Sequence, residues 1–387
     1  MALETASTVL SIRLVPLLFV LLAVAPDFRL SFDSLVWKLR GILHLHPLPE
    51  DLNSWAYTPT RDRSVRNQDQ LRLWGYWLFL KPVFELKGYA LFERGEKTSR
   101  VPAKSSPSRA ISTGRKSEYP FPRKFFETDD DPLRVWPARD RNGNDVMVRL
   151  ISGSEPSEEL AVWKRLHSSA LKNHPRNRSI PVLDYIRFDG LTFIVMPRWD
   201  SPTFQDFATV EEILYFADCI LDFVDFMHEN RIFHRDLTEG NICLNVLGSV
   251  DKFYETGRCD PNDALYAVID FGHSVAYPLE SDLDEITTTL HYGTEFGPPL
   301  ERNPFKVEMY WVGTMINRSV RIIEEIVPEI VPFLNNLIES DEADCPSARE
   351  ALEQFRQLQA KLTVEQLKAP LKYRFFDRGK FVPKSTM

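Results

Sequence analysis

The sequence predicts an α+β protein in which a small strand-rich part precedes a larger helical part. Asn142 and Gly143 stand between the apolar runs 133–138 and 145–151. Asn-Gly between two such runs is a strong β-hairpin signal, because both turn positions must accept positive φ. Amphipathic segments with helical spacing follow later in the chain. They span 209–229, 307–325 and 348–362. Strands first and helices after are typical of the α+β class.

Length and composition indicate a globular protein. The chain has 387 residues, of which 43% are hydrophobic and 26% charged, enough for a full core with additional segments. The net charge of −8 argues against general nucleic-acid binding. The four cysteines lie far apart without a CxxC pair, which fits neither a disulfide framework nor a zinc site. We expect reduced thiols in a cytoplasmic protein.

An apolar run from Leu14 to Ala25 marks the N-terminal region. It has the length of a signal-peptide core and is too short to span a hydrocarbon layer of ~30 Å unaided. Ala23 to Ala25 has the small-x-small form of a cleavage site, but Pro26 and Glu4 weaken that interpretation. We expect a helix docked on the protein or on a membrane surface, and a signal or membrane anchor within 9–26 is the alternative.

Two segments precede the hairpin. Residues 1–94 form an aromatic-rich extension, in which 70–79 is predicted to be a helix that breaks near Pro82. Its aromatic side chains are expected to pack against the rest of the protein rather than bind a ligand. Residues 95–122 are rich in Ser, Pro, Lys and Arg and predict a flexible basic linker. A phosphoregulated or anion-contacting loop is the alternative there.

Two further elements follow the hairpin. The segment 157–167 predicts a helix with Ser157 as its N-cap, and Glu158 and Glu159 favour the N-terminal end of the helix dipole. The apolar run 191–196 predicts a strand.

The segment 234–241 (HRDLTEGN) and the later tripeptide 270–272 (DFG) carry the most specific chemistry. Asp236 can accept a proton from an acceptor hydroxyl. Asn241 and Asp270 can hold a divalent metal ion against phosphate oxygens. Any one of these side chains alone would more often be a turn former or helix cap. The order and spacing of all three indicate phosphoryl transfer.

This constellation resembles the catalytic and metal-binding loops of the eukaryotic-type protein kinase superfamily. The resemblance implies a two-lobed fold, with Asp236 as catalytic base, Asn241 and Asp270 as magnesium ligands, and ATP with Mg²⁺ as the nucleotide. The implied divisions are 1–94 (extension), 95–122 (linker), 123–199 (small lobe), 200–365 (large lobe) and 366–387 (tail).

In the small lobe, the strand 146–149 is similar to the Val-Ala-Ile-Lys strand of the family, with Arg149 in place of the lysine. The resemblance implies that Arg149 contacts the nucleotide phosphates and pairs with a helical glutamate. Glu159 is the best candidate, because Val162, Trp163 and Leu166 follow it at helix-face spacing, although a separation of ten residues is short for the family.

The same resemblance implies the walls of the nucleotide pocket. Met147 replaces the small residue over the adenine, Met196 takes the gatekeeper position, and Arg198 lies in the hinge. The implied nucleotide-binding set is therefore Met147, Arg149, Met196, Arg198, Asn241 and Asp270.

Downstream, Gly293-Thr294 and Glu301 resemble the end of the activation segment, with Glu301 seven positions after the threonine. Cys345 replaces the arginine that usually pairs with this glutamate, and Arg349 is the expected substitute. In the next helix Glu308 replaces the usual aspartate, and we expect its longer carboxylate to hold the catalytic-loop backbone.

Other positions depart from the family pattern. Gly114 is the only glycine between 96 and 142, so no glycine-rich phosphate loop is visible. Thr238 stands where Ser/Thr kinases carry a lysine, and 247–262 predicts a surface insertion. Arg235 resembles the arginine that pairs with a phosphorylated activation loop.

Phosphorylation candidates are Thr287, Thr288 and Thr289. Our alternative hypothesis is that the acidic residues of 282–285 already hold Arg235 without phosphorylation.

These features leave three functions open. The first is an ATP- and Mg²⁺-dependent protein kinase acting on Ser or Thr hydroxyls of an unidentified protein substrate. The second is a pseudokinase scaffold, favoured by Arg149 and by the missing glycine-rich loop. The third is a small-molecule phosphotransferase, suggested by the Glu239-Gly240-Asn241 form of the loop.

Overall fold

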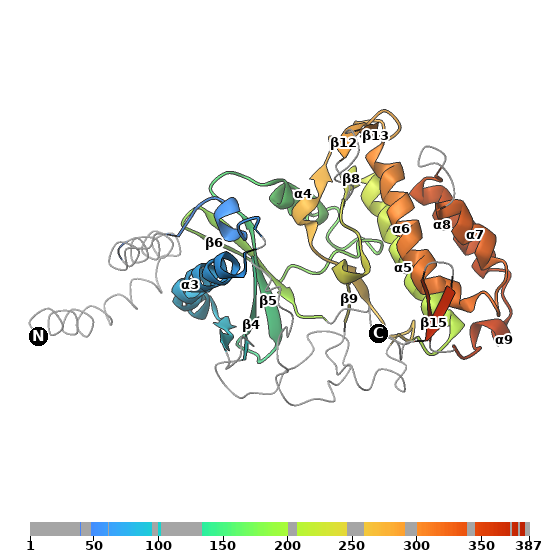
Figure 1. Cartoon of the computed structure of the whole chain (residues 1–387), viewed down its shortest axis with the longest axis horizontal. Coiled ribbons are helices and arrows are strands. Elements are labelled where there is room, and N and C mark those ends of the chain that lie inside the picture. Colours follow the sequence, from blue (N-terminus) through green and yellow to red (C-terminus); the bar gives the residue numbers. More distant parts are fainter. Residues whose placement is uncertain are drawn as a thin grey trace, which may run out of the picture.

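The computed structural model confirms the α+β class (Figure 1). A five-stranded antiparallel sheet with helix α3 lies toward one end of the molecule, and helices α5 to α8 gather toward the other. The residues that the structure describes are 39, 48–60, 62–94, 100–101, 134–199, 207–245, 259–290, 300–338, 345–371, 374–377 and 380–383.

The sheet has the strand order β1-β4-β5-β7-β6. Its strands are β1 (Ala90–Leu91), β4 (Val135–Arg139), β5 (Asp145–Ser152), β6 (Asp184–Phe188) and β7 (Leu191–Pro197). The predicted hairpin is confirmed, because β4 pairs with β5 and Arg139 lies opposite Asp145. Gly143 has a φ of +83° in the turn, which a residue without Cβ accepts at no steric cost. The predicted strand 191–196 is β7.

Helix α3 (Arg63–Lys87) covers one face of this sheet. Alternate residues of the two central strands pack toward it: Val146, Val148 and Leu150 from β5, and Leu191, Phe193 and Val195 from β7. Residues between them, including Arg149 and Ile194, must point to the opposite face, because side chains alternate along a strand. One face of the sheet is thus closed by α3, and the other is left for the remaining helices.

The aromatic side chains of α3 pack against the protein, as predicted. Trp77 is buried, and its ring centroid lies 5.5 Å from that of Trp136 on β4 and 6.0 Å from that of Phe193 on β7. Residues 63–91 thereby share a core and, through β1, a sheet with the strands that follow.

The predicted break of this helix near Pro82 is wrong. Helix α3 continues through Pro82 to Lys87 and ends at Gly88, which has a φ of +98°. Proline removes one helical hydrogen bond. Leu80, Val83 and Phe84 are buried on either side of it, and their burial against the sheet offsets the missing bond.

The predicted helices after the hairpin are present. The N-cap of α4 (Glu158–Leu166) is Ser157, whose side chain accepts a hydrogen bond from the Leu160 N–H, as predicted. Helix α5 (Val210–Glu229) packs against α8 (Ala348–Gln359) and α6 (Pro304–Val320). The segment predicted as 307–325 begins earlier, because Asn303 caps α6, and its end is a separate 3-10 turn, η7 (Arg321–Ile323).

The remaining elements outside the candidate site are short. They are η1 (Asn53–Trp55), β2 (Glu93–Arg94), β3 (Arg100–Val101), β12 (Thr288–Leu290), β13 (Leu300–Arg302), α7 (Ile330–Ile338), α9 (Val364–Leu367), β14 (Arg374–Asp377) and β15 (Lys380–Pro383).

Helix α5 carries an acidic face that arginines from other segments neutralise. Arg176 donates to the buried carboxylates of Asp222, at 3.2 Å from Nε to Oδ1, and of Asp225. Arg356 on α8 reaches Asp222 at 3.0 Å from Nη2 to Oδ1. A third arginine, Arg349 on α8, also pairs with this face. It contacts Asp225 and Glu229 rather than Glu301, so the expected pairing with Glu301 is wrong.

The physical reason lies in exposure. Asp225 is buried and needs a cation, whereas Glu301 is exposed on β13, where water solvates its charge.

Several predicted segments lie outside the described residues. They are the apolar run 14–25, most of the linker 95–122, most of the insertion 247–262, and Gly293-Thr294. Within the described part of the chain, no helix combines the length and apolarity needed to cross a membrane.

Candidate active site

Two short strand pairs bring the predicted site residues together. Strand β8 (Ile232–Phe233) pairs with β11 (Val275–Ala276) and leads into the loop 234–241, which ends in the 3-10 turn η4 (Glu239–Asn241). Strand β9 (Ile242–Leu244) pairs with β10 (Tyr266–Val268), with Val268 opposite Ile242. The Ile269 N–H donates to the Asn241 carbonyl at 2.9 Å. This pairing puts Asn241 opposite Ile269, the residue before Asp270, although 28 residues of the chain lie between Asn241 and Asp270.

The Asn241 amide is oriented by Asp236. Its Nδ2 donates to the Asp236 carbonyl at 2.7 Å and to Asp236 Oδ2 at 3.0 Å. Both partners are acceptors, so the NH₂ end of the amide must face Asp236. The amide oxygen therefore points away from Asp236 and is the end that a cation would contact.

Asp270 begins the turn η6 (Phe271–His273) in a left-handed conformation, with a φ of +61°. Its Oδ1 accepts from the Gly272 N–H at 3.2 Å and from Arg149 Nη2 at 2.5 Å. Burial alone raises the pKa of the Asp270 carboxyl, but the Arg149 guanidinium and the Gly272 N–H outweigh it, so the net shift is downward. Asp270 is therefore held as a carboxylate.

The predicted pair between Arg149 and Glu159 is present. Arg149 Nε donates to Glu159 Oε1 at 2.6 Å, and both side chains are buried. Arg149 thus joins three elements, because β5 carries it, α4 carries Glu159, and η6 begins at Asp270. Burial alone would lower the pKa of the Arg149 guanidinium, but Glu159 and Asp270 outweigh it through charge and hydrogen bonding, so the net shift is upward and the group stays charged.

Glu308 on α6 supports the backbone of the loop 234–241, as expected from the sequence. Its Oε1 accepts from the His234 N–H at 2.8 Å and from the Arg235 N–H at 3.0 Å. Arg235 has a φ of +67°, so this backbone conformation needs such support. The Ser274 hydroxyl adds a bond to the His234 carbonyl at 3.0 Å, which ties the loop to the segment after Asp270.

The three residues predicted to line a nucleotide pocket divide into two groups. Met147 and Met196 lie opposite each other on β5 and β7. They point to the same face of the sheet as Arg149, because 147 and 149 share the strand period. Arg198 instead pairs with the buried Asp145, at 3.2 Å from Nη1 to Oδ2. The structure therefore gives Arg198 a role in anchoring the start of β5.

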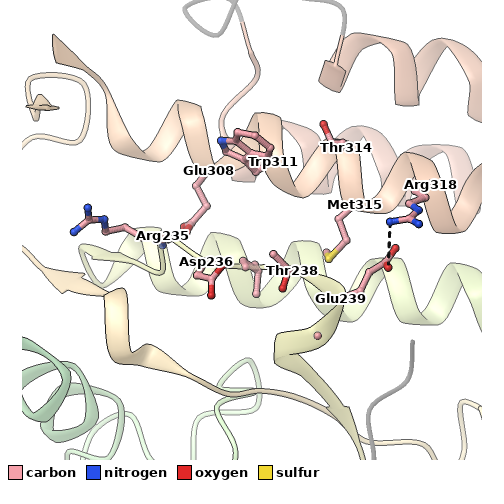
Figure 2. A pocket seen from close by; sticks show the side chains of 11 residues that line it. Arg235, Asp236, Thr238, Glu239, Glu308, Trp311, Thr314, Met315 and Arg318 are labelled. Atoms are coloured by element: carbon pink, nitrogen blue, oxygen red, sulfur yellow. Dashed lines mark hydrogen bonds and ion pairs between the residues drawn. The ribbon is translucent and has the colours of Figure 1, made fainter. Parts of the chain in front are cut away.

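A pocket of about 460 Å³ opens between the loop 235–240 and helix α6 (Figure 2). Trp311 and Met315 form an apolar wall on α6, and Asp236 and Thr238 lie on the opposite side. At one end Glu239 pairs with Arg318 at 3.9 Å.

Glu308 lines this pocket and was expected to hold the loop, but the other α6 residues, Trp311, Thr314, Met315 and Arg318, were not predicted from the sequence. The signal was available in their spacing, since positions 311, 315 and 318 fall on one face of a helix.

The alternative hypothesis was that the acidic segment 282–285 holds Arg235. Two hydrogen bonds lie within this segment, from the Asp284 N–H to Asp282 Oδ1 at 3.0 Å and from the Glu285 N–H to the Asp282 carbonyl at 3.3 Å. Both carboxylates are exposed. The predicted role of these acids stays a prediction.

The donor set fits a hard divalent cation. In the described ranges, no cluster of three or more His, Cys, Asp and Glu side chains has the arrangement of a metal site. The predicted set is smaller: the Asp270 carboxylate and the Asn241 amide oxygen. Among the described residues, hydrogen bonds reach Asp270 only at Oδ1, which leaves Oδ2 for a ligand. Two oxygen donors completed by phosphate oxygens and water are typical of magnesium sites.

A comparison of the chain with models of known protein families found no match.

Proposed function

We propose that this protein is a phosphotransferase of the protein-kinase type, which transfers the γ-phosphoryl group of ATP to Ser or Thr hydroxyls of a protein. One observation carries the proposal. Asp236 and Asn241 are hydrogen-bonded to each other, Asp270 follows directly on the residue that pairs with Asn241, and Arg149 joins Asp270 to Glu159. Phosphoryl transfer needs this combination, because it depends on positioning and on charge stabilisation more than on covalent chemistry.

The chain topology supports the same proposal. Arg149 lies on the third strand, in chain order, of the five-stranded sheet, and Glu159 lies on the next helix. Protein kinases hold their phosphate-contacting lysine on the third strand and pair it with a helical glutamate. A sheet-rich part beside a helical part is also what a two-lobed kinase-like fold requires.

Each side chain has a defined task in this reaction. Asp236 orients the acceptor hydroxyl and takes its proton as the new bond forms. Asn241 keeps Asp236 in place through its amide N–H groups. Its amide oxygen and Asp270 would hold Mg²⁺, which supplies charge neutralisation at the phosphate oxygens when bound. Arg149 keeps Asp270 ionised and correctly placed.

The pocket beside Asp236 supports a site for the acceptor. Its lining includes Asp236 itself and the apolar wall of Trp311 and Met315. A side chain next to the acceptor residue could bury apolar surface there while the hydroxyl reaches the carboxylate.

A second function, a pseudokinase scaffold, is favoured by one contact. Arg149 Nη2 lies 2.5 Å from Asp270 Oδ1, so an internal cation already neutralises the principal metal ligand. A protein that only needs its shape for docking would keep such a pair.

The test is phosphoryl transfer from γ-labelled ATP to a generic protein substrate and, separately, to small alcohols. We expect transfer to protein, and we expect Asp236→Asn to abolish it without lowering the thermal unfolding temperature. Asp189→Asn is the matched control, since Asp189 has a φ of +47° in the remote β6–β7 turn, which Asn also tolerates.

The other outcomes separate the alternatives. ATP binding without transfer selects the scaffold. Transfer to alcohols alone selects a small-molecule phosphotransferase. Transfer that survives Asp236→Asn would remove Asp236 from the mechanism.

A further inference from the structure

A second arginine, Arg134, stands beside Arg149 in the candidate active site. It immediately precedes β4, and its carbonyl accepts from the Leu150 N–H at 2.8 Å, which fixes its backbone at the end of the sheet. No motif of the sequence singled it out.

The two guanidinium groups converge over Gly272. A Cβ atom at this glycine would lie 2.8 Å from Arg149 Nη2 and 3.0 Å from Arg134 Nη2. Burial lowers the pKa of the Arg134 guanidinium, and repulsion from the neighbouring Arg149 charge lowers it further. Glu159 stands between them, with its Oε2 3.6 Å from Arg134 Nη1.

Exposure separates the roles of the two arginines. The Arg149 side chain is 7% exposed and donates to both Glu159 and Asp270, so its guanidinium holds the site together. The Arg134 side chain is 26% exposed, and its contact with Glu159 is longer than a hydrogen bond. Asp270, the neighbouring carboxylate, is 38% exposed, so this side of the cluster is open to solvent.

We propose that Arg134 is the cation that contacts the nucleotide's phosphate groups, and that Arg149 is a positioning residue that fixes Glu159 and Asp270. Arg134 then takes the place of a glycine-rich loop, with a fork of N–H donors matched to phosphate oxygens. The ligand class is a polyphosphate, as a nucleoside di- or triphosphate. This inference rests on the proposed function for its nucleotide, and the following experiment tests the two separately.

The experiment measures binding of ATP, adenosine and tripolyphosphate by calorimetry, each with Mg²⁺ and with EDTA. We expect Arg134→Gln, which keeps the side-chain length, to weaken ATP and tripolyphosphate about ten- to hundredfold and to leave adenosine binding unchanged. Arg134→Lys should restore part of the loss. Arg187→Gln is the matched control, because Arg187 is an exposed arginine on the edge strand β6 of the same sheet.

Three results decide the matter. Tripolyphosphate binding that depends on Arg134 supports the anion site. If tripolyphosphate binds in this way but adenosine and ATP do not bind, the anion site stands and the proposed ATP-dependent function is rejected. Equal affinity of the native protein and Arg134→Gln for ATP or tripolyphosphate would overturn the inference. A native protein that binds neither ATP nor tripolyphosphate would overturn it as well.

Discussion

Glu308 and His228 join the two central helices of the protein through a buried hydrogen bond of 2.8 Å between Oε2 and Nε2. The other carboxylate oxygen of Glu308 accepts the two backbone N–H groups at the start of the loop 234–241. One side chain therefore sets both the packing of α5 on α6 and the position of Asp236.

Replacing Glu308 should damage stability and activity together. Glu308→Ala leaves the N–H groups of His234 and Arg235 and the His228 ring without their acceptor, so we expect the free energy of unfolding to fall by about 3 kcal/mol. Chemical denaturation measures this change. Glu353→Ala on the exposed face of α8 is the control, with an expected change within about 0.5 kcal/mol. Equal losses in both variants would show that Glu308 has no special role.

The free energy of unfolding at acidic pH should depend on His167. This residue stacks on Trp163 with 5.2 Å between ring centroids, and its Nδ1 has no hydrogen-bond partner in the described part of the chain. Burial lowers the pKa of its imidazole because it disfavours the charged form, and the Trp163 backbone offsets only part of this shift. The unfolded chain therefore binds the proton more readily than the folded one.

The sign of the pH effect follows from this lowered pKa. The unfolding free energy is unaffected by this group well above pH 6.5, and falls as pH drops through 6.5 toward the lower folded-state pKa. The slope from one proton is at most about 1.4 kcal/mol per pH unit. His167→Phe keeps the ring stacking without the titration. Its denaturation midpoint should fall less than that of the native protein between pH 7 and 5.5, and parallel curves would contradict the assignment.

Gly272→Ala should separate stability from phosphate binding. The added methyl would meet the ends of Arg149 and Arg134 and come within 3.0 Å of Asp270 Oδ1. Side-chain ends can move, so we expect a modest loss of stability, about 1 kcal/mol, with a larger loss of ATP affinity. Thermal unfolding and calorimetry measure the two effects. Gly75→Ala is the control, since a Cβ there would meet no atom within 4 Å.

Trp311→Ala should weaken binding of the acceptor substrate and leave ATP binding unchanged. Removing the indole strips one wall from the pocket beside Asp236, so we expect KM for a protein substrate to rise about tenfold with kcat nearly unchanged. Steady-state kinetics at saturating ATP provide the measurement. Leu279→Ala, another exposed apolar residue outside this pocket, is the comparison. A fall in kcat at constant KM would instead place Trp311 in the support of the loop 234–241.

Local signals allowed the sequence to predict much of the site. The Asn-Gly turn, the Ser157 cap and the spacing from Glu159 to Leu166 are short-range patterns, and each appears in the structure as expected. The prediction for Glu308 also held, because its position in the motif identified the backbone it supports.

Long-range contacts explain what the sequence did not reveal. Pro82 predicted a break, since nothing local showed that its neighbours would be buried by strands more than 50 residues later. Arg349 was assigned to Glu301 from its place in the motif, but the fold brings it beside Asp225 on the acidic face of α5. Arg134 could not be recognised from the sequence, because only the pairing of β4 with β5 brings it beside Arg149.

The packing of α3 on the sheet also affects how the chain folds during translation. The ribosome completes α3, with its tryptophan-rich face, at Lys87, whereas the strand β7 that packs on this face ends only at Pro197. During translation this face must wait for more than 100 further residues before it is covered. We therefore expect the apolar face of α3 to be exposed over that interval, and a recombinant fragment that starts after residue 94 to expose the apolar face of the sheet that α3 covers.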